Sequence, residues 1–265
     1  MRGSTPTPNR EFLRTGGNTP CLELRTADGG LFVLDCGTGL RQLGKALVKE
    51  FGENPIHARI FLSHFHWDHI QGIPFFAPLY HERNQFFFHG YQLQDASVRR
   101  ALEGQMNNPY FPVDMSTMRA HRHFFAFTEE RTEYDELVLI SRRLQHPQGC
   151  LGYRMECRGK VVVYASDNEP GTRQGDENVR RLADGADVLI YDAQYTPLEM
   201  KYKRKWGHST WKEGVRIAKE CKVKKLILFH HDPERDDKAV SRIVKRAQDH
   251  FDDVVAAREG MVVAL

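Results

Sequence analysis

The segment SHFHWDH, residues 63–69, constrains this chain more than any other, because four potential metal ligands fall within six residues. The preceding run ARIFL, residues 58–62, is apolar and has polar neighbours, which predicts a short buried strand. The candidate ligands therefore follow the C-terminal end of a strand, where open α/β sheets place their sites.

These ligands are of two chemical kinds. Imidazole suits zinc and similar transition ions, and a carboxylate adds a hard oxygen donor. His64 and His66 point to one side of an extended segment, because side chains alternate along a strand. Asp68 and His69 fall on the following turn, from which they reach a second ion. The alternative, a surface cluster of histidines, does not account for the buried strand before it.

The segment resembles the signature of the metallo-β-lactamase superfamily, and the resemblance continues along nearly the whole chain in matching order. Asp35, in LDCGTG, resembles the structural aspartate of that family. His146, Asp167 and His230 resemble its later ligands, and each ends an apolar run. The resemblance implies an α/β fold, the four-layer αββα sandwich, as one domain over residues 1–265. The first edge strand of the family, which usually precedes a segment like residues 2–6, is expected to be missing.

The resemblance also implies two divalent metal ions, with Zn²⁺ expected first and Mn²⁺ or Fe as alternatives. It assigns the ligands in three groups: His64, His66 and His146 to the first ion, Asp68, His69 and His230 to the second, and Asp167 as the bridge between them. Taken singly, His146 and Asp167 could also be ordinary polar loop residues.

Ligand identity and a second motif resemble those of the phosphodiesterase branch of this superfamily. Lactamases typically have cysteine at the position of Asp167, and the redox diiron branch has an acid where His66 stands. The motif GHST, residues 207–210, is similar to one in the tRNA 3′-processing endonuclease and the phosphoribosyl cyclic phosphate phosphodiesterase. This resemblance makes His208 a general acid for the leaving alkoxide, oriented by Asp192.

A carboxylate that holds an imidazole fixes its tautomer and favours the imidazolium. Asp68 is counted with His208 and Asp192 among the expected catalytic residues. The plainer alternatives are a helix-capping or core histidine and a structural aspartate at a strand end. Sulfatases, lactonases and thioester hydrolases of the superfamily share many of these metal ligands, so the ligands alone do not identify the phosphodiesterase branch.

The leading prediction is a binuclear metal-dependent phosphodiesterase that hydrolyses a small phosphodiester, such as a cyclic nucleotide or cyclic ribose phosphate, by attack of a metal-bound hydroxide. One alternative is a tRNA 3′-processing endonuclease, and another is a non-catalytic nucleotide-binding module of the same fold. The endonucleases clamp tRNA with a long inserted arm, commonly between the positions of His146 and Asp167. Only about twenty residues separate the two here, enough for a strand hairpin.

Composition limits the setting of this activity. The net charge of +3 permits an anionic substrate but does not demonstrate nucleic-acid binding. A small phosphodiester is the expected substrate, and no stable nucleic-acid partner is expected. Five scattered cysteines without a C-x-x-C pair favour reduced thiols in a cytoplasmic protein. No apolar run approaches the roughly 20 residues that span a bilayer, so no membrane partner is expected. A homodimer is a further expectation that the sequence leaves open.

Periodicity predicts the other elements and leaves some segments ambiguous. Strands are expected at 21–25, 31–34, 85–89, 136–144, 152–157, 160–165, 188–192, 225–229 and 260–265, and helices at 41–51, 97–105, 179–182, 210–221 and 239–251. The stretch 119–123 is either a solvated edge strand or a phosphate-binding patch. The loop 106–112 is either a lid or a packed crossing. His231 either binds phosphate or faces solvent. The basic residues at 201–205 either form a solvated face or guide a phosphate-bearing substrate.

Overall fold

The computed structural model describes residues 1–92 and 97–265, and the chain divides into two compact units. One unit comprises residues 19–127, and the other joins residues 1–18 to residues 128–265. The expectation of a single domain over the whole chain stays a prediction.

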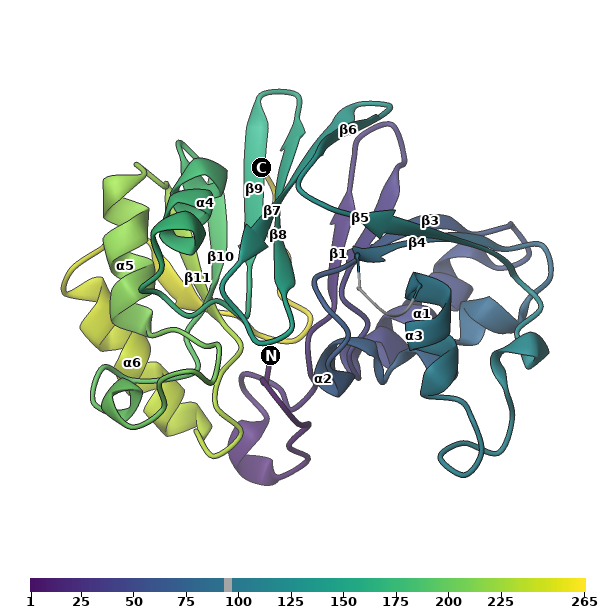
Figure 1. The fold of residues 1–265 in the computed structure, drawn as a ribbon, viewed down its shortest axis with the longest axis horizontal. Helices are drawn as coiled ribbons and strands as arrows, with labels where there is room; N and C mark the ends of the chain where they lie inside the picture. The colour runs from purple at the N-terminus through teal and green to yellow at the C-terminus, as the bar shows by residue number, and fades with distance from the viewer. Residues whose placement is uncertain (93–96) are drawn as a thin grey trace. The chain divides into compact units, whose positions relative to one another are not determined.

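The unit of residues 19–127 is built on a five-stranded sheet in the order β1-β2-β3-β4-β5 (Figure 1). Its strands are β1 (Leu22–Arg25), β2 (Leu31–Leu34), β3 (His57–Leu62), β4 (Gln85–Tyr91) and β5 (His121–Phe127). The first two form the expected antiparallel hairpin, and each later pair is parallel. Because β5 is an edge strand, the edge-strand prediction for this stretch is confirmed.

The helices of this unit are α1 (Gly39–Phe51), α2 (Trp67–Ile70) and α3 (Val98–Gly104), with short 3₁₀ turns η2 (Ile73–Phe75) and η3 (Ala77–Tyr80) following α2. The α1 helix buries Leu40, Gly44 and Leu47, whose spacing of three or four residues forms one apolar stripe. That stripe belongs to the same core as Ile60 and Leu62 of β3. The core fixes the end of β3, from which the motif of residues 63–69 begins.

The second unit contains a seven-stranded sheet in the order β12-β11-β10-β9-β8-β7-β6. Its strands are β6 (Arg131–Tyr134), β7 (Leu137–Leu144), β8 (Cys150–Cys157), β9 (Lys160–Ala165), β10 (Val188–Asp192), β11 (Lys225–Phe229) and β12 (Val254–Ala256). Strands β9 to β12 run parallel, whereas β6 to β9 are joined antiparallel. The carboxyl ends of β9, β10 and β11 therefore meet at one edge of the sheet.

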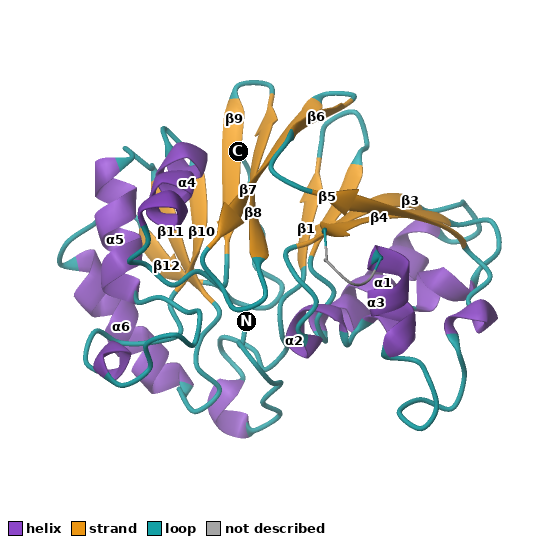
Figure 2. Ribbon diagram, in the orientation of Figure 1, coloured by secondary structure: helices purple, strands orange, loops and turns teal. Residues whose placement is uncertain are grey.

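Three helices cover one face of these strands, namely α4 (Arg173–Ala183), α5 (Trp211–Glu220) and α6 (Asp237–Gln248) (Figure 2). Each begins at a side chain that accepts a backbone N–H of its first turn, namely Thr172, Thr210 and Asp236. Such caps satisfy backbone donors that a helix leaves without partners. The cap at Thr210 lies two residues after His208, so α5 starts close to the candidate site.

Most of the expected elements are present, with three differences. The strand expected at 260–265 is wrong, because the sheet closes with β12, which pairs in parallel with β11. The α4 helix is longer than expected, and β6 was not expected. Among the described residues, β1 is the first strand, and Arg2 forms only an isolated bridge with His231. In the described part of the chain, no helix combines the length and apolar character needed to cross a bilayer.

Candidate metal centre and catalytic histidine

In the unit of residues 19–127, the motif turns sharply from the end of β3 into α2, and this turn gathers its side chains. His66 is the N-terminal cap residue of α2, so Asp68 and His69 lie in the first turn of that helix. The His64 ring lies 4.5 Å from that of His66 and 4.2 Å from that of His69 between ring centroids. Asp68 Oδ2 lies 3.2 Å from His69 Nε2. The four expected ligands of this segment are therefore brought together.

Asp35 and Ser63 orient these imidazoles. His69 Nδ1 lies 2.8 Å from Asp35 Oδ2, and His64 Nδ1 lies 3.0 Å from Ser63 Oγ. Asp35 also accepts the backbone N–H and the hydroxyl of Ser63, at 2.7 and 2.9 Å. It is completely buried, so these bonds are shielded from water. With Nδ1 engaged in this way, Nε2 is the nitrogen of His69 left for a metal ion.

In the other unit, three strand ends bring a second set of candidate ligands together. Asp167 follows β9 and His230 follows β11, and His230 Nε2 lies 3.4 Å from Asp167 Oδ1. His146, two residues after β7, has its Nε2 4.0 Å from the same carboxylate oxygen. Ser166 Oγ donates to the second oxygen, Asp167 Oδ2, at 2.5 Å. Each of these three expected ligands is buried.

The Nδ1 atoms of these histidines are also held by oxygen atoms. His146 Nδ1 donates to the backbone carbonyl of Gly207 at 2.8 Å, and His230 Nδ1 donates to Gln194 Oε1 at 2.7 Å. This assignment leaves Nε2 of both rings as the donor atom on the side of Asp167. Ligating histidines in proteins usually donate their other N–H in this way. The buried imidazole and carboxylate donors fit a divalent transition ion such as zinc.

His208 has a partner of a different kind. Its Nδ1 lies 2.9 Å from Asp192 Oδ2, at the end of β10. The His208 ring stacks on that of His230 with centroids 4.9 Å apart, and its Nδ1 lies 3.7 Å from Asp167 Oδ1. Sequence reasoning expected both His208 and Asp192 here, and the structure places them in direct contact.

Asp192 also has a structural role. It accepts the backbone N–H groups of Asp167, Gln194 and Ser209 at 3.0–3.1 Å. One carboxylate thus ties the end of β9 to the segment that carries His208. Asp192 therefore fits both interpretations, because it bonds to the backbone as a structural aspartate and also contacts His208.

His231 does not face solvent. It is completely buried, and its backbone N–H and carbonyl bond to Met1 and Gly3. Burial, followed by the positive charges of the N-terminus, Arg2 and Arg235, lowers the pKa of its imidazole well below the usual value. The solvent-facing alternative is therefore wrong, and a neutral, enclosed imidazole is a poor partner for a phosphate.

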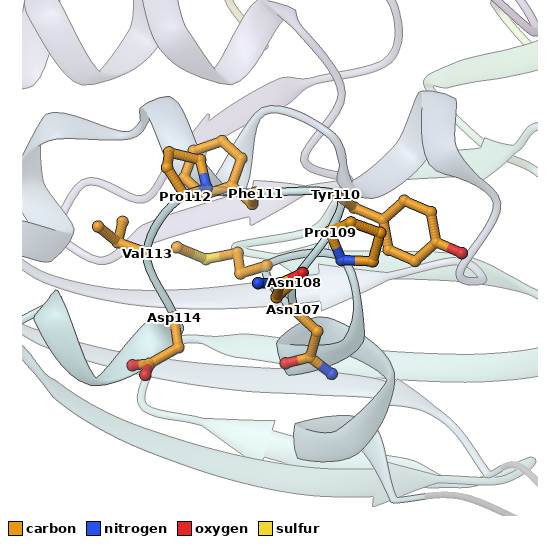
Figure 3. A pocket seen from close by; sticks show the side chains of 9 residues that line it. Asn107, Asn108, Pro109, Tyr110, Phe111, Pro112, Val113 and Asp114 are labelled. Atoms are coloured by element: carbon orange, nitrogen blue, oxygen red, sulfur yellow. The ribbon is translucent and has the colours of Figure 1, made fainter.

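The loop after α3 lines an open hollow of about 820 Å³ (Figure 3). The hollow is lined by residues 106–114 alone, with Tyr110 and Pro109 at one side and Val113 and Asp114 at another. Phe111 packs edge-on against Phe75, which ends η2, with ring centroids 5.9 Å apart. The loop therefore packs against the segment that follows the metal motif. Its role as a lid stays a prediction.

Sequence reasoning missed several residues that position the site. They are Ser63, Gln194, the Gly207 carbonyl and Glu169, a buried carboxylate that accepts two backbone N–H groups near His208. One sequence feature could have indicated Gln194 and Glu169. Each lies two residues after an expected site aspartate, Asp192 and Asp167 respectively. The seven-ligand assignment draws on both units, so it stays a prediction.

The chain belongs to the family described as the β-lactamase superfamily domain. Residues 31–231 match the model of that family. The protein YhfI from Bacillus subtilis, described as a metallo-β-lactamase fold protein, superimposes with a TM-score of 0.69 at 20% identity, over 98% of this chain and 94% of that one. A diphosphatase from the PhnP family superimposes with a TM-score of 0.65 at 19% identity, over 99% and 88%. The expected fold class is therefore confirmed.

A ribonuclease Z from Streptococcus mutans serotype c (strain ATCC 700610 / UA159) is 26% identical over 321 aligned positions, covering 94% of this chain and 97% of the relative. The alignment is longer than the 265 residues of this chain, so the relative contains segments that are absent here. These relatives confirm the expected superfamily, its phosphodiesterase branch and the expected class of enzyme, a hydrolase.

Proposed function

We propose that this protein is a binuclear metal-dependent phosphodiesterase that hydrolyses a small phosphodiester. The observation that carries the proposal is the contact of 2.9 Å between His208 and Asp192, beside Asp167 and His230. An imidazole held by a carboxylate next to candidate metal ligands suits an acid that protonates a leaving oxygen.

Two divalent ions, once bound by the seven expected ligands, would supply a nucleophile at neutral pH and neutralise charge on the phosphate. As water adds to phosphorus, the bond from phosphorus to the leaving oxygen breaks. His208 donates its Nε2 proton to that oxygen, while Asp192 holds the Nδ1 proton. The products are a phosphomonoester and an alcohol, and His208 regains its proton from solvent.

The surrounding residues keep this arrangement rigid. Four of the expected histidine ligands are held at Nδ1 by an oxygen atom. The pairs are His69 with Asp35, His64 with Ser63, His230 with Gln194, and His146 with the Gly207 carbonyl. Fixed rings lower the conformational cost of binding ions and of reaching the transition state. Zinc is the ion that this donor set favours, with manganese or iron as alternatives.

The segment between His146 and Asp167 supports a small substrate. It consists of β8 and β9, joined at Arg158 and Gly159, and contains no inserted arm. The longer alignment with the ribonuclease Z relative is consistent with an insertion that this chain lacks. A net charge of +3 adds little to hold a large polyanion.

A second candidate is a tRNA 3′-processing endonuclease, favoured by the name of the ribonuclease Z relative. In that case another surface of the chain would replace the arm in binding tRNA. A stable nucleic-acid complex would then be expected, whereas our proposal expects none. A homodimer and a cytoplasmic location remain expectations under both candidates.

Metal content and turnover test the proposal together. After purification with excess zinc, elemental analysis is expected to find two ions per chain, because seven mixed ligands exceed the four of one tetrahedral ion. The protein should hydrolyse bis(p-nitrophenyl) phosphate with zinc or manganese. His66→Ala should lower metal content and turnover together, while His57→Ala, an exposed histidine at the start of β3, serves as the matched control.

One ion or none per wild-type chain would contradict the binuclear proposal. Two ions without turnover of any ester in a screen of cyclic nucleotides, cyclic ribose phosphates and precursor tRNA would favour the non-catalytic module. Turnover confined to precursor tRNA would favour the endonuclease.

A further inference from the structure

Trp206 lies exposed beside the candidate catalytic histidine. It is 61% exposed, although it is only two residues from the buried His208. The next residue, Gly207, contacts the ring of His146 through its carbonyl oxygen. A large, solvent-exposed aromatic side chain next to a polar site is a recurrent feature of ligand-binding surfaces.

The backbone on both sides of Trp206 is held by one buried carboxylate. Glu169 accepts the N–H of Lys205 with Oε1 at 2.8 Å and the N–H of Gly207 with Oε2 at 2.9 Å. Lys205 has a φ of +70°, which non-glycine residues rarely adopt. Glu169 thus holds a strained turn in place, and the turn presents the indole outward. A side chain fixed at its backbone loses less entropy when it binds a ligand.

Lys203 connects Trp206 to the catalytic histidine. Its ammonium nitrogen lies 5.8 Å from the Trp206 ring centroid and 4.6 Å from that of Tyr195. Tyr195 in turn packs edge-on against His208, with centroids 5.7 Å apart. Asp232 Oδ2 lies 3.4 Å from the same ammonium and balances part of its charge. The indole is therefore part of a packed series that ends at His208.

We propose that Trp206 is a nucleobase-binding residue, and that the ester cleaved here is a nucleotide and not a base-free sugar phosphate. This inference rests on the proposed phosphodiesterase function, because it names the substrate class of that same site. An indole beside a lysine offers a stacking surface and a positive charge, the two features that bind a base and its phosphate. Stacking alone accepts every base, so the subsite discriminates little among the four.

A matched pair of esters tests this proposal. The base-bearing ester is 2′,3′-cyclic AMP, and its base-free counterpart is 1-O-methylribose 2,3-cyclic phosphate. Trp206→Ala is expected to lower the ratio of kcat/KM for the first to that for the second by roughly 5- to 150-fold, mainly through KM. Trp206→Phe should restore part of the ratio, because a smaller ring still stacks. Tyr202→Ala removes an 83% exposed aromatic residue of the same segment and should leave the ratio unchanged.

Binding of adenosine 5′-monophosphate provides a readout that needs no turnover. The nucleotide should quench the tryptophan fluorescence of the wild type saturably, and Trp206→Phe should abolish that quenching. Unchanged quenching in Trp206→Phe, or an equal effect of Trp206→Ala on both esters, would overturn the nucleobase subsite. Wild-type protein that cleaves no ester of the wider screen but shows quenching dependent on Trp206 would sink the proposed function and keep the subsite. The two failures are therefore distinguishable.

Discussion

Nδ1 of His208 lies 2.9 Å from Oδ2 of Asp192, and the same carboxylate accepts three backbone N–H groups. The imidazole thus contacts a side chain that backbone N–H groups already hold in place. Its orientation follows from the end of β10 and does not depend on a bound substrate. A proton donor arranged in advance needs little reorganisation during reaction.

The first prediction concerns His208→Ala. The variant should keep its metal ions but lose roughly 10²–10⁴-fold in kcat on an ester with a ribose leaving group, because general acid help is worth about that much. It should lose far less on a p-nitrophenyl ester, whose leaving group departs without a proton. Parallel assays of both esters, with metal analysis, provide the measurement.

Asp192→Asn extends this test. It should show a milder form of the same asymmetry, since the imidazole keeps a hydrogen-bond partner. Equal losses on both esters, or loss of metal from His208→Ala, would show that His208 has another role.

The second prediction concerns Gly207. Its φ is +84°, and a Cβ there would overlap the His146 ring and Pro147. Gly207→Ala should therefore displace His146 and weaken metal binding, roughly 10- to 100-fold, as loss of supporting contacts does at other metal sites. Titration with zinc against a competing chelator measures the change. Gly185→Ala is the control, because Gly185 has a φ of +62° but open space at its Cβ. Equal zinc affinity in both variants would contradict the steric argument.

The third prediction is that precursor tRNA is a poor substrate. The short β8–β9 hairpin leaves no inserted arm between His146 and Asp167. Contacts with phosphates would then dominate binding, which should be weak and fall steeply as salt rises. Cleavage assays across a range of salt concentrations, with the Streptococcus mutans ribonuclease Z as positive control, provide the comparison. Efficient, site-specific 3′ cleavage at physiological salt would support the endonuclease instead.

The fourth prediction concerns pH. Burial, followed by the Arg59 guanidinium, lowers the pKa of His89 from 6.5 to about 3. The folded state therefore resists protonation of His89. Its stability is complete above the unfolded pKa and falls as pH drops from about 6.5 toward 3. His89→Phe keeps a ring between Phe61 and Phe125, which each stack on His89 at 4.9 Å, and removes the titration.

The free energy of unfolding of His89→Phe, relative to wild type, should rise by up to about 1.4 kcal/mol per pH unit below 6.5. Urea unfolding of both proteins between about pH 4 and pH 8 measures the difference. A difference that stays constant over this range would mean that His89 titrates normally in the folded protein.

Local sequence predicted the strands that carry ligands, because an apolar run followed by a polar group is a short-range pattern. The ends of β3, β9 and β11 were expected for this reason. The supporting contacts were not, because Glu169 and the segment of Lys205 are far apart in sequence. The strand β12 has three residues, too few for a recognisable alternation, so the sequence favoured the more apolar stretch 260–265. The strand β6 is polar and half exposed, so hydrophobicity did not indicate it.

Asp35 and His230 each follow a strand immediately, and Asp167 lies two residues after β9. All three have a φ between +56° and +59°. This left-handed conformation costs roughly 1–2 kcal/mol for a non-glycine residue. Glycine at these positions would relax the backbone but would remove a carboxylate or an imidazole. Selection for stability and selection for activity therefore act in opposite directions at these three positions. The fold is less stable than its architecture permits, and the difference is the thermodynamic cost of aiming the functional groups.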